Sequence, residues 1–301
     1  MKKIAIQKGS LILLFILAIT QLQANPERKK TEYNRSFHES YSVNSDARLI
    51  LETSFTDVEI INWDKDEIDI SVDITINSRS ESDAEKLFNK INIEMSGNSN
   101  TVNLGTSLKN GTNTNNIDWS IKAVIYAPSG INLDATMEFG NLITQNVAGN
   151  CNIHVEFGNI DGTFPSAKND ISIEYGNITA AVLGCKSVTV EFGAIEIGVL
   201  TSSCDISSDF SKVKIGAVTE QCDDLDISVE FGSLKLNLLP SSNFRIDASS
   251  SFGDIDFDGE FKIHDKDKGM FDLSYSASIG SGGGKINIDS SYSDINIKTR
   301  N

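Results

Sequence analysis

The sequence predicts an all-β protein whose main part is a parallel β-solenoid with coils of about 18–21 residues. One observation is a recurring phrase of an apolar residue, an acid, an aromatic residue and glycine, first at Met137–Leu142 and then at Val155–Ile160. Its aromatic residues follow one another at steps of 18, 18, 17, 18, 21 and 21 residues. Strand-like content at a period near 20 is typical of a solenoid. The chain also has four prolines, so that few hydrogen-bond donors are missing from its strands.

The first 24 residues have the pattern of a secretory signal peptide. Three lysines precede an apolar run at 11–19, and Ala24 is the small residue that a cleavage site requires. The run is shorter than the roughly 20 residues that span a bilayer, and no second run of spanning length follows. We therefore expect an exported protein, in the periplasm, on the outer cell surface or extracellular, with no transmembrane segment after cleavage. A retained anchor is the alternative.

The formal charge is −16, and cleavage of the lysine-bearing signal would make it more negative. Such a surface repels nucleic acid and anionic lipid, which excludes nucleic acid as an expected partner. The residues that follow the signal, 25–36, are polar and basic and should form a flexible leader.

Residues 37–130 are predicted to form a strand-rich cap at one end of the solenoid. Apolar and polar side chains alternate over 68–76, as in a half-buried strand, and Ser54–Ile60 already resembles the recurring phrase. Residues 96–116 should be a loop around a short strand at 102–104.

The cap contains one predicted helix, at 83–90. The sequence Ser82-Asp83-Ala84-Glu85 is a capping box, and Ala84, Leu87 and Phe88 are spaced for one apolar face. Packed on the open end of a sheet, this helix would protect an edge strand from pairing with other chains.

Residues 131–260 form the predicted coils, and alternation assigns the faces of each. Ile153, Val155 and Phe157 fall on one side of a strand, with Glu156 on the other. We therefore expect the rings to be core and to form one buried ladder with a spacing of about 4.8 Å, in which Phe192→Ala costs roughly 3 to 5 kcal/mol. The ladder comprises Phe139, Phe157, Tyr175, Phe192, Phe210, Phe231 and Phe252.

The residues around each aromatic also have predicted roles. Glycine after the ring supplies a bend that a side chain would crowd. Asn141, Asn159 and Asn177 follow at the turn, where stacked amides can bond along the axis.

Residues 261–301 are predicted to be a hairpin and a last coil. Strands at 271–279 and 285–289 should pair around Gly280–Gly284, and 291–297 repeats the coil pattern. The glycine run is not a phosphate-binding loop, because Lys285 is followed by Ile286 where a hydroxyl is needed and no helix pattern follows.

The four cysteines precede the aromatic residues of their coils by 6, 7, 6 and 9 residues, so they should lie near one corner. Coils about 4.8 Å apart suit the Cα separation of a disulfide, whereas Cys151 and Cys185 are separated by an intervening coil. Cys204 can therefore pair with either Cys185 or Cys222. Four buried, reduced thiols are the alternative, although an exported protein meets an oxidising compartment.

An acid directly precedes most of the aromatic residues, and stacking would align these acids in one exposed stripe. Like charges about 5 Å apart repel one another. Splayed side chains, basic side chains from a neighbouring strand or a bound divalent cation such as calcium could relieve the repulsion; no other cofactor is indicated. The stripe, and hence the candidate metal site, consists of Glu138, Glu156, Glu174, Glu191, Asp209 and Glu230.

Catalytic constellations are absent from the sequence pattern. His38, His154 and His264 are far apart, and no triad or zinc site can be assembled from them. Paired carboxylates for polysaccharide cleavage are the alternative, because acids are abundant.

Several features together resemble the putative-adhesin families of Bacteroidota. They are the signal peptide, the Trp63–Glu67 stretch before a long alternating strand, the capped helix, the Gly-Asn-Ile and Gly-Asp-Ile coils and the closing glycine-rich hairpin, over roughly 40–299. The resemblance implies a secreted or envelope β-solenoid and supplies no catalytic residues. This chain differs from the commonest coil in having Glu-Phe-Gly-Asn in place of Ser-Gly-Asp.

Two functions follow from these patterns. The first is a non-enzymatic, adhesin-like protein of the envelope or exterior, whose repetitive face binds a surface, a cell-surface polysaccharide or an envelope protein. The second is a polysaccharide lyase or hydrolase. An enzyme should carry clustered acids and a base on an insertion, and the coils from Met137 to Phe257 contain no large insertion.

Overall fold

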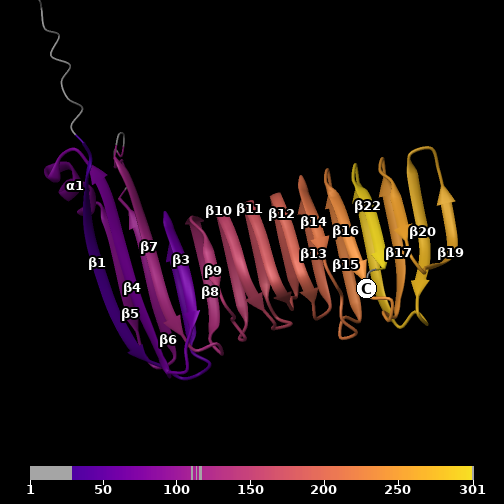
Figure 1. Ribbon diagram of the computed structural model, residues 1–301, viewed down its shortest axis with the longest axis horizontal. Coiled ribbons are helices and arrows are strands. Elements are labelled where there is room, and N and C mark those ends of the chain that lie inside the picture. The colour runs from indigo at the N-terminus through magenta and orange to yellow at the C-terminus, as the bar shows by residue number, and fades with distance from the viewer. Residues whose placement is uncertain (1–28, 110, 113, 115–116, 300–301) are drawn as a thin grey trace, which may run out of the picture.

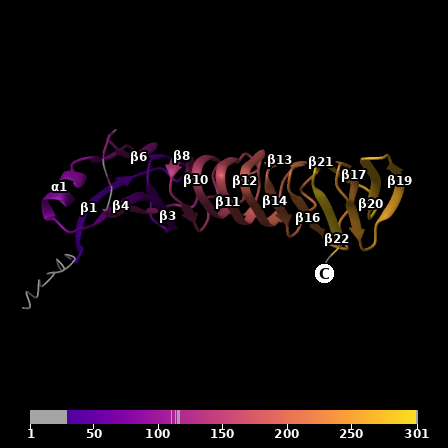
Figure 2. The same cartoon turned by 90° about the horizontal axis from the view of Figure 1, so that it is seen from above.

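The computed structural model describes residues 29–299 except 110, 113, 115 and 116. The predicted signal peptide at 1–24 lies outside the described residues. The described part is all-β, with one helix, and its strands stand side by side along the long axis of an elongated molecule (Figures 1 and 2). The predicted fold class is confirmed to that extent.

Strand pairing arranges the strands in two rows, which we call face 1 and face 2. Most pairings within each row are parallel. The antiparallel ones lie at the N-terminal end of face 1 and at both ends of face 2. The rows meet where three long strands run from one into the other: β10 (Cys151–Phe164), β11 (Asp170–Leu183) and β12 (Ser187–Leu200).

Face 1 contains the second parts of these long strands. In order of pairing it runs from β1 (Thr31–Ser42) through β4 (Glu67–Ser78), β7 (Asp118–Ala127), β3 (Thr56–Asn62), β9 (Leu142–Thr144), β10–β12, β14 (Ser211–Ile215), β16 (Ser233–Leu238) and β22 (Asp294–Thr299) to β18 (Ile255–Asp258).

Face 2 contains the first parts. It runs from β5 (Ile91–Gly97) through β6 (Thr101–Leu108), β2 (Arg48–Thr53), β8 (Asn132–Phe139), β10–β12, β13 (Cys204–Asp209), β15 (Asp224–Glu230), β21 (Gly284–Ser291), β17 (Phe244–Ser251) and β20 (Asp272–Ile279) to β19 (Lys262–Lys268).

The core lies between the two faces. In β10, Ile153 and Val155 point inward from face 2, and Ile160 and Phe164 point inward from face 1. Buried residues of both faces belong to one continuous cluster along the molecule. Burying these β-branched and aromatic side chains is the main stabilising contribution, because each is worth about 1.5–3 kcal/mol.

The order of strands along the faces differs from their order in the sequence at two places. Near the N-terminal end, β2 lies between β6 and β8, and β3 lies between β7 and β9. Near the other end, β21 and β22 are inserted between the 224–238 strands and the 244–258 strands. The last repeat of the sequence, at 291–297, therefore does not lie at the end of the molecule.

The helix α1 (Glu81–Phe88) lies at the N-terminal end of the molecule, beside β1 and β4 (Figure 2). Its buried residues are Ala84, Leu87 and Phe88, as predicted. It begins two residues earlier than predicted, because Ser80 and not Ser82 is the N-cap: its side chain accepts from the Asp83 N–H. Among the described residues no helix is long and apolar enough to cross a membrane.

Two predicted segments differ from the structure. The leader assigned to 25–36 overlaps β1, which begins at Thr31 and pairs along its whole length with β4. The reason is that Tyr33, Phe37 and Tyr41 pack against the core, so that this polar segment has apolar anchors. The short strand predicted at 102–104 within the 96–116 loop is present but longer, as the eight residues of β6.

The predicted C-terminal hairpin is wrong in its pairing. β20 and β21 do not pair with each other; they lie on opposite sides of β17. The glycine-rich connection passes over the start of β17, where the Asn243 side-chain oxygen accepts from the Ser281 N–H and the Gly283 N–H. The actual hairpin is β19–β20, which is antiparallel and forms the end of face 2.

Candidate binding surface

A continuous line of stacked aromatic rings follows the edge at which the two faces meet. Adjacent ring centroids from Phe55 to Phe252 are 4.7–5.1 Å apart, with interplanar angles of 14° or less. We call this line, with its two end rings, the aromatic ridge. In spatial order it is Trp119, Phe55, Phe139, Phe157, Tyr175, Phe192, Phe210, Phe231, Tyr292, Phe252 and Phe271.

The stacking of the predicted aromatic residues is confirmed, but their burial is wrong. Phe157 is 39% exposed and Phe210 is 55% exposed, and the other predicted rings except the half-buried Phe139 also face solvent. The inward positions Val155 and Ile160 are five residues apart, an odd number. The alternation therefore changes phase between them, and the chain turns the corner there with the ring on the outside.

Two kinds of backbone make this corner. At Gly140, Gly158, Gly176 and Gly193, φ is between 140° and 157°, and a Cβ would overlap the carbonyl oxygen of the neighbouring corner. Elsewhere the aromatic residue itself has positive φ, as in Phe210 (47°). Left-handed backbone at a non-glycine residue costs about 1–2 kcal/mol, so packing of the ring must offset strain at these corners.

A polar row borders the ridge on the side of face 1. The Asn141 side-chain nitrogen donates to Asp57, Asn159 donates to Asn141, and Asn177 donates to Asn159, each at 2.8 Å. The predicted amide ladder is thus confirmed. Its acceptor oxygens also take the backbone N–H of the next asparagine, so these side chains are fixed along the axis.

The predicted acidic stripe borders the ridge on the side of face 2; we call it the acid row. Strand pairing aligns Glu230 with Asp209 directly, and its members are exposed or half-buried. Ser54 donates to Glu138 at 2.9 Å, and His154 Nε2 lies 3.9 Å from Glu174. The other carboxylates of the row have no ion pair or side-chain hydrogen bond among the described residues.

Acids on face 1 are arranged differently. There, Lys214 pairs with Glu196, Lys122 pairs with Glu59 at 2.8 Å, and Lys298 pairs with Asp258 at 3.1 Å, each across neighbouring strands. The bond with Glu59 raises the pKa of Lys122. Cross-strand lysines therefore neutralise carboxylates of face 1, and on face 2 Arg48 pairs with Asp134 at 2.7 Å, but no lysine among the described residues pairs with the acid row.

The carboxylates of the acid row, the candidate metal ligands, do not converge on one point. A tight calcium site gathers six to eight oxygens around one point, whereas this row places one acid at each corner. In the part of the chain that the structure describes, no group of three or more His, Cys, Asp or Glu side chains is placed to hold a metal ion.

The exposed ring edges determine what the ridge can contact. Each internal ring is covered on both sides by its neighbours at about 4.9 Å, so that its π-faces are not accessible. Sugars that stack on aromatic residues need a free ring face. The ridge instead offers a narrow apolar strip of C–H edges, with polar side chains on both sides.

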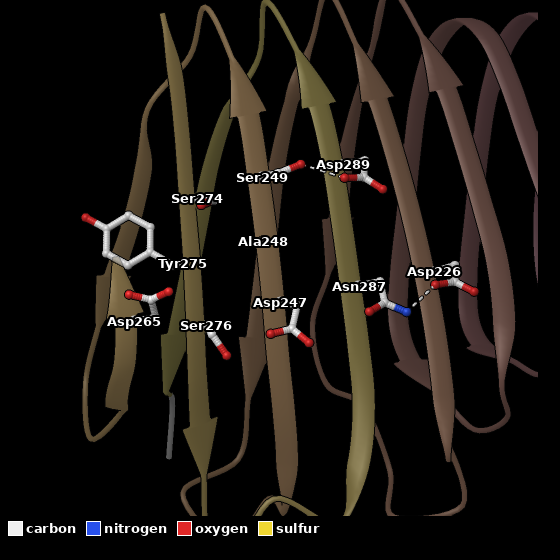
Figure 3. Close-up of a pocket in the computed structure, with 10 residues that line it drawn as sticks. All are labelled: Asp226, Asp247, Ala248, Ser249, Asp265, Ser274, Tyr275, Ser276, Asn287 and Asp289. Atoms are coloured by element: carbon white, nitrogen blue, oxygen red, sulfur yellow. Dashed lines mark hydrogen bonds between the residues drawn. The ribbon is translucent and has the colours of Figure 1, made fainter. Parts of the chain in front are cut away.

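A shallow acidic groove lies on the outer side of face 2 near the C-terminal end (Figure 3). Its volume is about 420 Å³, and its lining comes from β15, β17, β19, β20 and β21. The Ser249 hydroxyl donates to Asp289 at 2.5 Å, and Asn287 donates to Asp226 at 2.6 Å. Asp247 is paired with Arg245 at 3.2 Å. No sequence signal pointed to this groove, because β21 joins β17 only through the exchanged strand order.

The histidines lie apart, on β1, β10 and β19. His38 contacts Asp69 at 2.8 Å, His154 contacts Ser172 at 2.9 Å, and His264 contacts Ser278 at 2.8 Å. Each is satisfied by a neighbouring strand. Among the described residues, only His154 has an acid near its other ring nitrogen, and Nε2 lies 3.9 Å from Glu174, which is too long for the hydrogen bond that orients the histidine of a triad.

One of the two predicted disulfides is present. Cys185 and Cys204 are bonded, with a Cα separation of 5.3 Å, whereas Cys151 and Cys222 are free and buried. Burial raises the pKa of each free thiol to about 12. Both are therefore unreactive, small apolar residues of the core.

A comparison with solved structures finds several proteins that this chain resembles at low sequence identity. A putative adhesin from Bacteroides fragilis is 12% identical, with a TM-score of 0.32, and covers 88% of this chain and 97% of its own. A putative cell adhesion protein from Clostridium sporogenes is 14% identical, with a TM-score of 0.24, over 90% of this chain and 100% of its own. The chain is similar to putative adhesins.

A third solved structure to which this chain is similar is a putative lipid binding protein from Parabacteroides distasonis. It is 13% identical, with a TM-score of 0.36, and covers 88% of this chain and 96% of its own. No family model matches the chain, and neither does any curated protein. At such identities and TM-scores, the partners of these neighbours do not carry over to this chain.

Proposed function

We propose that the protein is an exported, non-enzymatic, adhesin-like β-solenoid that binds a surface, a polysaccharide or a protein partner along its aromatic ridge. The observation that carries the proposal is the exposure of stacked rings over most of the length of the molecule. Soluble monomers rarely expose a contiguous apolar strip of this extent unless it is an interaction site. An extended, regular surface is also what a solenoid offers a partner.

The two-face arrangement supports the solenoid part of the proposal. Corresponding residues of successive phrases pair in register, as Phe157 with Tyr175 and Tyr175 with Phe192. Each phrase contributes one strand to each face and turns at the ridge, which is the expected path of a coil. The antiparallel strands at both ends would then serve as caps.

Export is the second part of the proposal. The pattern at 1–24 supports it, and so does the Cys185–Cys204 disulfide, because disulfides persist in oxidising compartments. Expression of the full chain in a bacterium, followed by fractionation and N-terminal sequencing, tests this part. We expect a mature N-terminus at Asn25 outside the cytoplasm, and full-length protein in the cytoplasm would contradict it.

The binding role is tested with a ridge variant of residues 25–301, in which Phe157, Tyr175 and Phe192 are replaced by serine. Binding to intact cells, a glycan array, lipid vesicles and envelope proteins is compared with that of the parent. The matched control replaces Asp161 and Thr179, exposed residues of the same strands on face 1, by alanine. Circular dichroism at the assay temperature confirms that both variants are folded.

We expect the parent and the control to bind one of these surfaces equally and the ridge variant to bind it at least tenfold more weakly. Equal binding by all three proteins would contradict a role for the ridge.

A polysaccharide-active enzyme is the second candidate, and the groove favours it. The β19–β20 hairpin lies between β18 and β21 in the sequence, and its Asp265 contributes to the same groove as Asp247 and Asp289 (Figure 3). Paired carboxylates are what glycoside hydrolysis needs. Incubation with a polysaccharide panel tests this reading: depolymerisation that Asp247→Asn and Asp265→Asn abolish would establish it, and intact polysaccharide would reject it.

A further inference from the structure

The ridge and the acid row are adjacent, and together they define the chemistry of a partner. We propose that they bind an extended protein segment that is both cationic and apolar, with Lys or Arg side chains over the acid row and apolar side chains on the ring edges. This inference rests on the proposed function of the ridge and names the class of its partner.

The apolar requirement comes from the rings. Phe192 lies between Tyr175 and Phe210 at 4.9 and 5.1 Å, so that only its edge is available. An edge strip cannot stack on a sugar ring, but aliphatic side chains can pack along it and remove it from water. Long basic side chains suit such a site in particular, because their methylene stems are apolar and their ends are charged.

The cationic requirement comes from the acid row. Five of its six members have no charged partner among the described residues, Glu174 beside His154 being the exception, although lysines neutralise acids across the strands of face 1. The row therefore carries uncompensated repulsion, which a cationic partner relieves and a neutral one does not. Contact with the apolar ring edges also lowers the local dielectric constant, which strengthens the attraction between the basic side chains of the partner and the acid row.

Charge also argues against four other occupants. A second copy of this chain would bring two acid rows together, with a formal charge of −16 on each molecule. An anionic lipid surface or nucleic acid would be repelled in the same way. An uncharged glycan would leave the acid row unpaired.

The dimensions fit a short segment. The acids follow the rings, whose centroids are about 4.9 Å apart, so that six acids extend over roughly 25 Å. An extended chain that rises about 3.3 Å per residue covers this length with about eight residues. Adding a segment along the ridge does not require any strand of the protein to open.

The test uses the protein at residues 25–301 and a fluorescein-labelled decapeptide, (Lys-Leu)5, in an anisotropy titration at 50 mM and 500 mM NaCl. Two peptides separate the requirements: (Glu-Leu)5 keeps the apolar residues, and (Lys-Ser)5 keeps the charge. We expect (Lys-Leu)5 to bind at least tenfold more tightly than either, and more weakly at 500 mM salt.

Two variants separate the acid row from general charge. The first carries Glu156→Gln, Glu174→Gln and Glu191→Gln. The second removes three exposed acids away from the ridge, by Asp161→Asn, Asp205→Asn and Glu220→Gln. Both lose the same formal charge, so that we expect at least tenfold weaker binding of (Lys-Leu)5 to the first and less than twofold change for the second.

The inference is overturned if (Glu-Leu)5 or (Lys-Ser)5 binds as tightly as (Lys-Leu)5, or if the two variants weaken binding equally. It is also overturned if (Lys-Leu)5 does not bind while the ridge variant loses binding to a glycan or vesicle; the proposed function then stands with a different partner. If the ridge variant binds every tested surface and the peptide as well as the parent does, the proposed function fails as well.

Discussion

Phe231 stacks on Tyr292, which lies close to the C-terminal end of the described residues, with ring centroids 4.9 Å apart and an interplanar angle of 3°. Tyr292 stacks in turn on Phe252, at 4.8 Å. The C-terminal strands are thus inserted between two pairs of strands that precede them in the sequence, and they hydrogen-bond to both. The C-terminal strands therefore connect the strands at 224–238 to the strands at 244–258.

Removal of residues 284–301 should therefore do more than shorten the molecule. β15 and β17 would each lose their partner β21, and β16 and β18 would lose β22. We expect amide hydrogens of 224–258 to exchange at least a hundredfold faster in the truncated protein, while those of β10 and β11 keep their protection. Hydrogen exchange with mass spectrometry measures both regions at once. Unchanged protection of 224–258 would contradict the exchanged strand order.

The corner glycines should tolerate no side chain. A Cβ at Gly176 would overlap the carbonyl oxygen of Gly158 in the neighbouring strand, and φ there is 149°. Gly176→Ala must therefore separate two paired strands, and we expect it to lower the free energy of unfolding by more than 4 kcal/mol or to prevent folding. Gly105→Ala, in β6, is the matched control, because its nearest contact would be 3.6 Å away. Urea denaturation of both variants gives the comparison, and an equal loss would contradict the packing at the corner.

Much of the fold could be predicted from the spacing of residues. The recurring phrase identified the stacked aromatics and the amide ladder from Asn141 to Asn177, because in-register pairing brings equal positions together. The side on which the rings lie was predicted wrongly, although the signal was present: Val155 and Ile160 are both apolar and an odd number of residues apart. Continuing the alternation through Phe157 ignored the turn that this spacing requires.

The exchanged strand order could not be predicted from the phrase. Tyr292 and Phe252 have equivalent local sequences, and nothing in either indicates which one pairs with the strands at 224–238. The groove of Figure 3 is a consequence of that exchange, since it brings Asp226 and Asp247 to either side of β21. Spacing within one phrase identifies local faces, whereas the choice between similar partners depends on the connections between strands.

The cysteines should show two reactivities. Burial raises the pKa of Cys151 from its ordinary 9.0 to about 12, and the same holds for Cys222. At pH 8 the native protein should therefore react with iodoacetamide at neither thiol, whereas protein unfolded without reductant should react at these two and reduced, unfolded protein at four. Modification of Cys185 or Cys204 without reductant would contradict the disulfide.

The same shift gives a pH dependence of stability. A thiol whose pKa is higher in the folded state binds more protons there than in the unfolded state at alkaline pH. Its contribution is therefore fully present below pH 9 and is lost as the pH rises from about 9 to about 12. We expect Cys151→Ala and Cys222→Ala together to flatten the decline of the melting temperature between pH 9 and 11, and an unchanged slope would show that other groups cause it.

The exposure of the ridge changes the expected cost of removing a ring. Phe192 is 40% exposed, and its stabilising contacts are the two stacked neighbours Tyr175 and Phe210. Aromatic pairs contribute about 0.5–1.5 kcal/mol each, so Phe192→Ala should lower the free energy of unfolding by about 1–3 kcal/mol. Phe164 is fully buried between the faces, and Phe164→Ala should cost about 3–5 kcal/mol, because it leaves a cavity that the strands cannot close. Chemical denaturation of the two variants under identical conditions measures the difference, and a larger loss for Phe192→Ala would place the ring in the core after all.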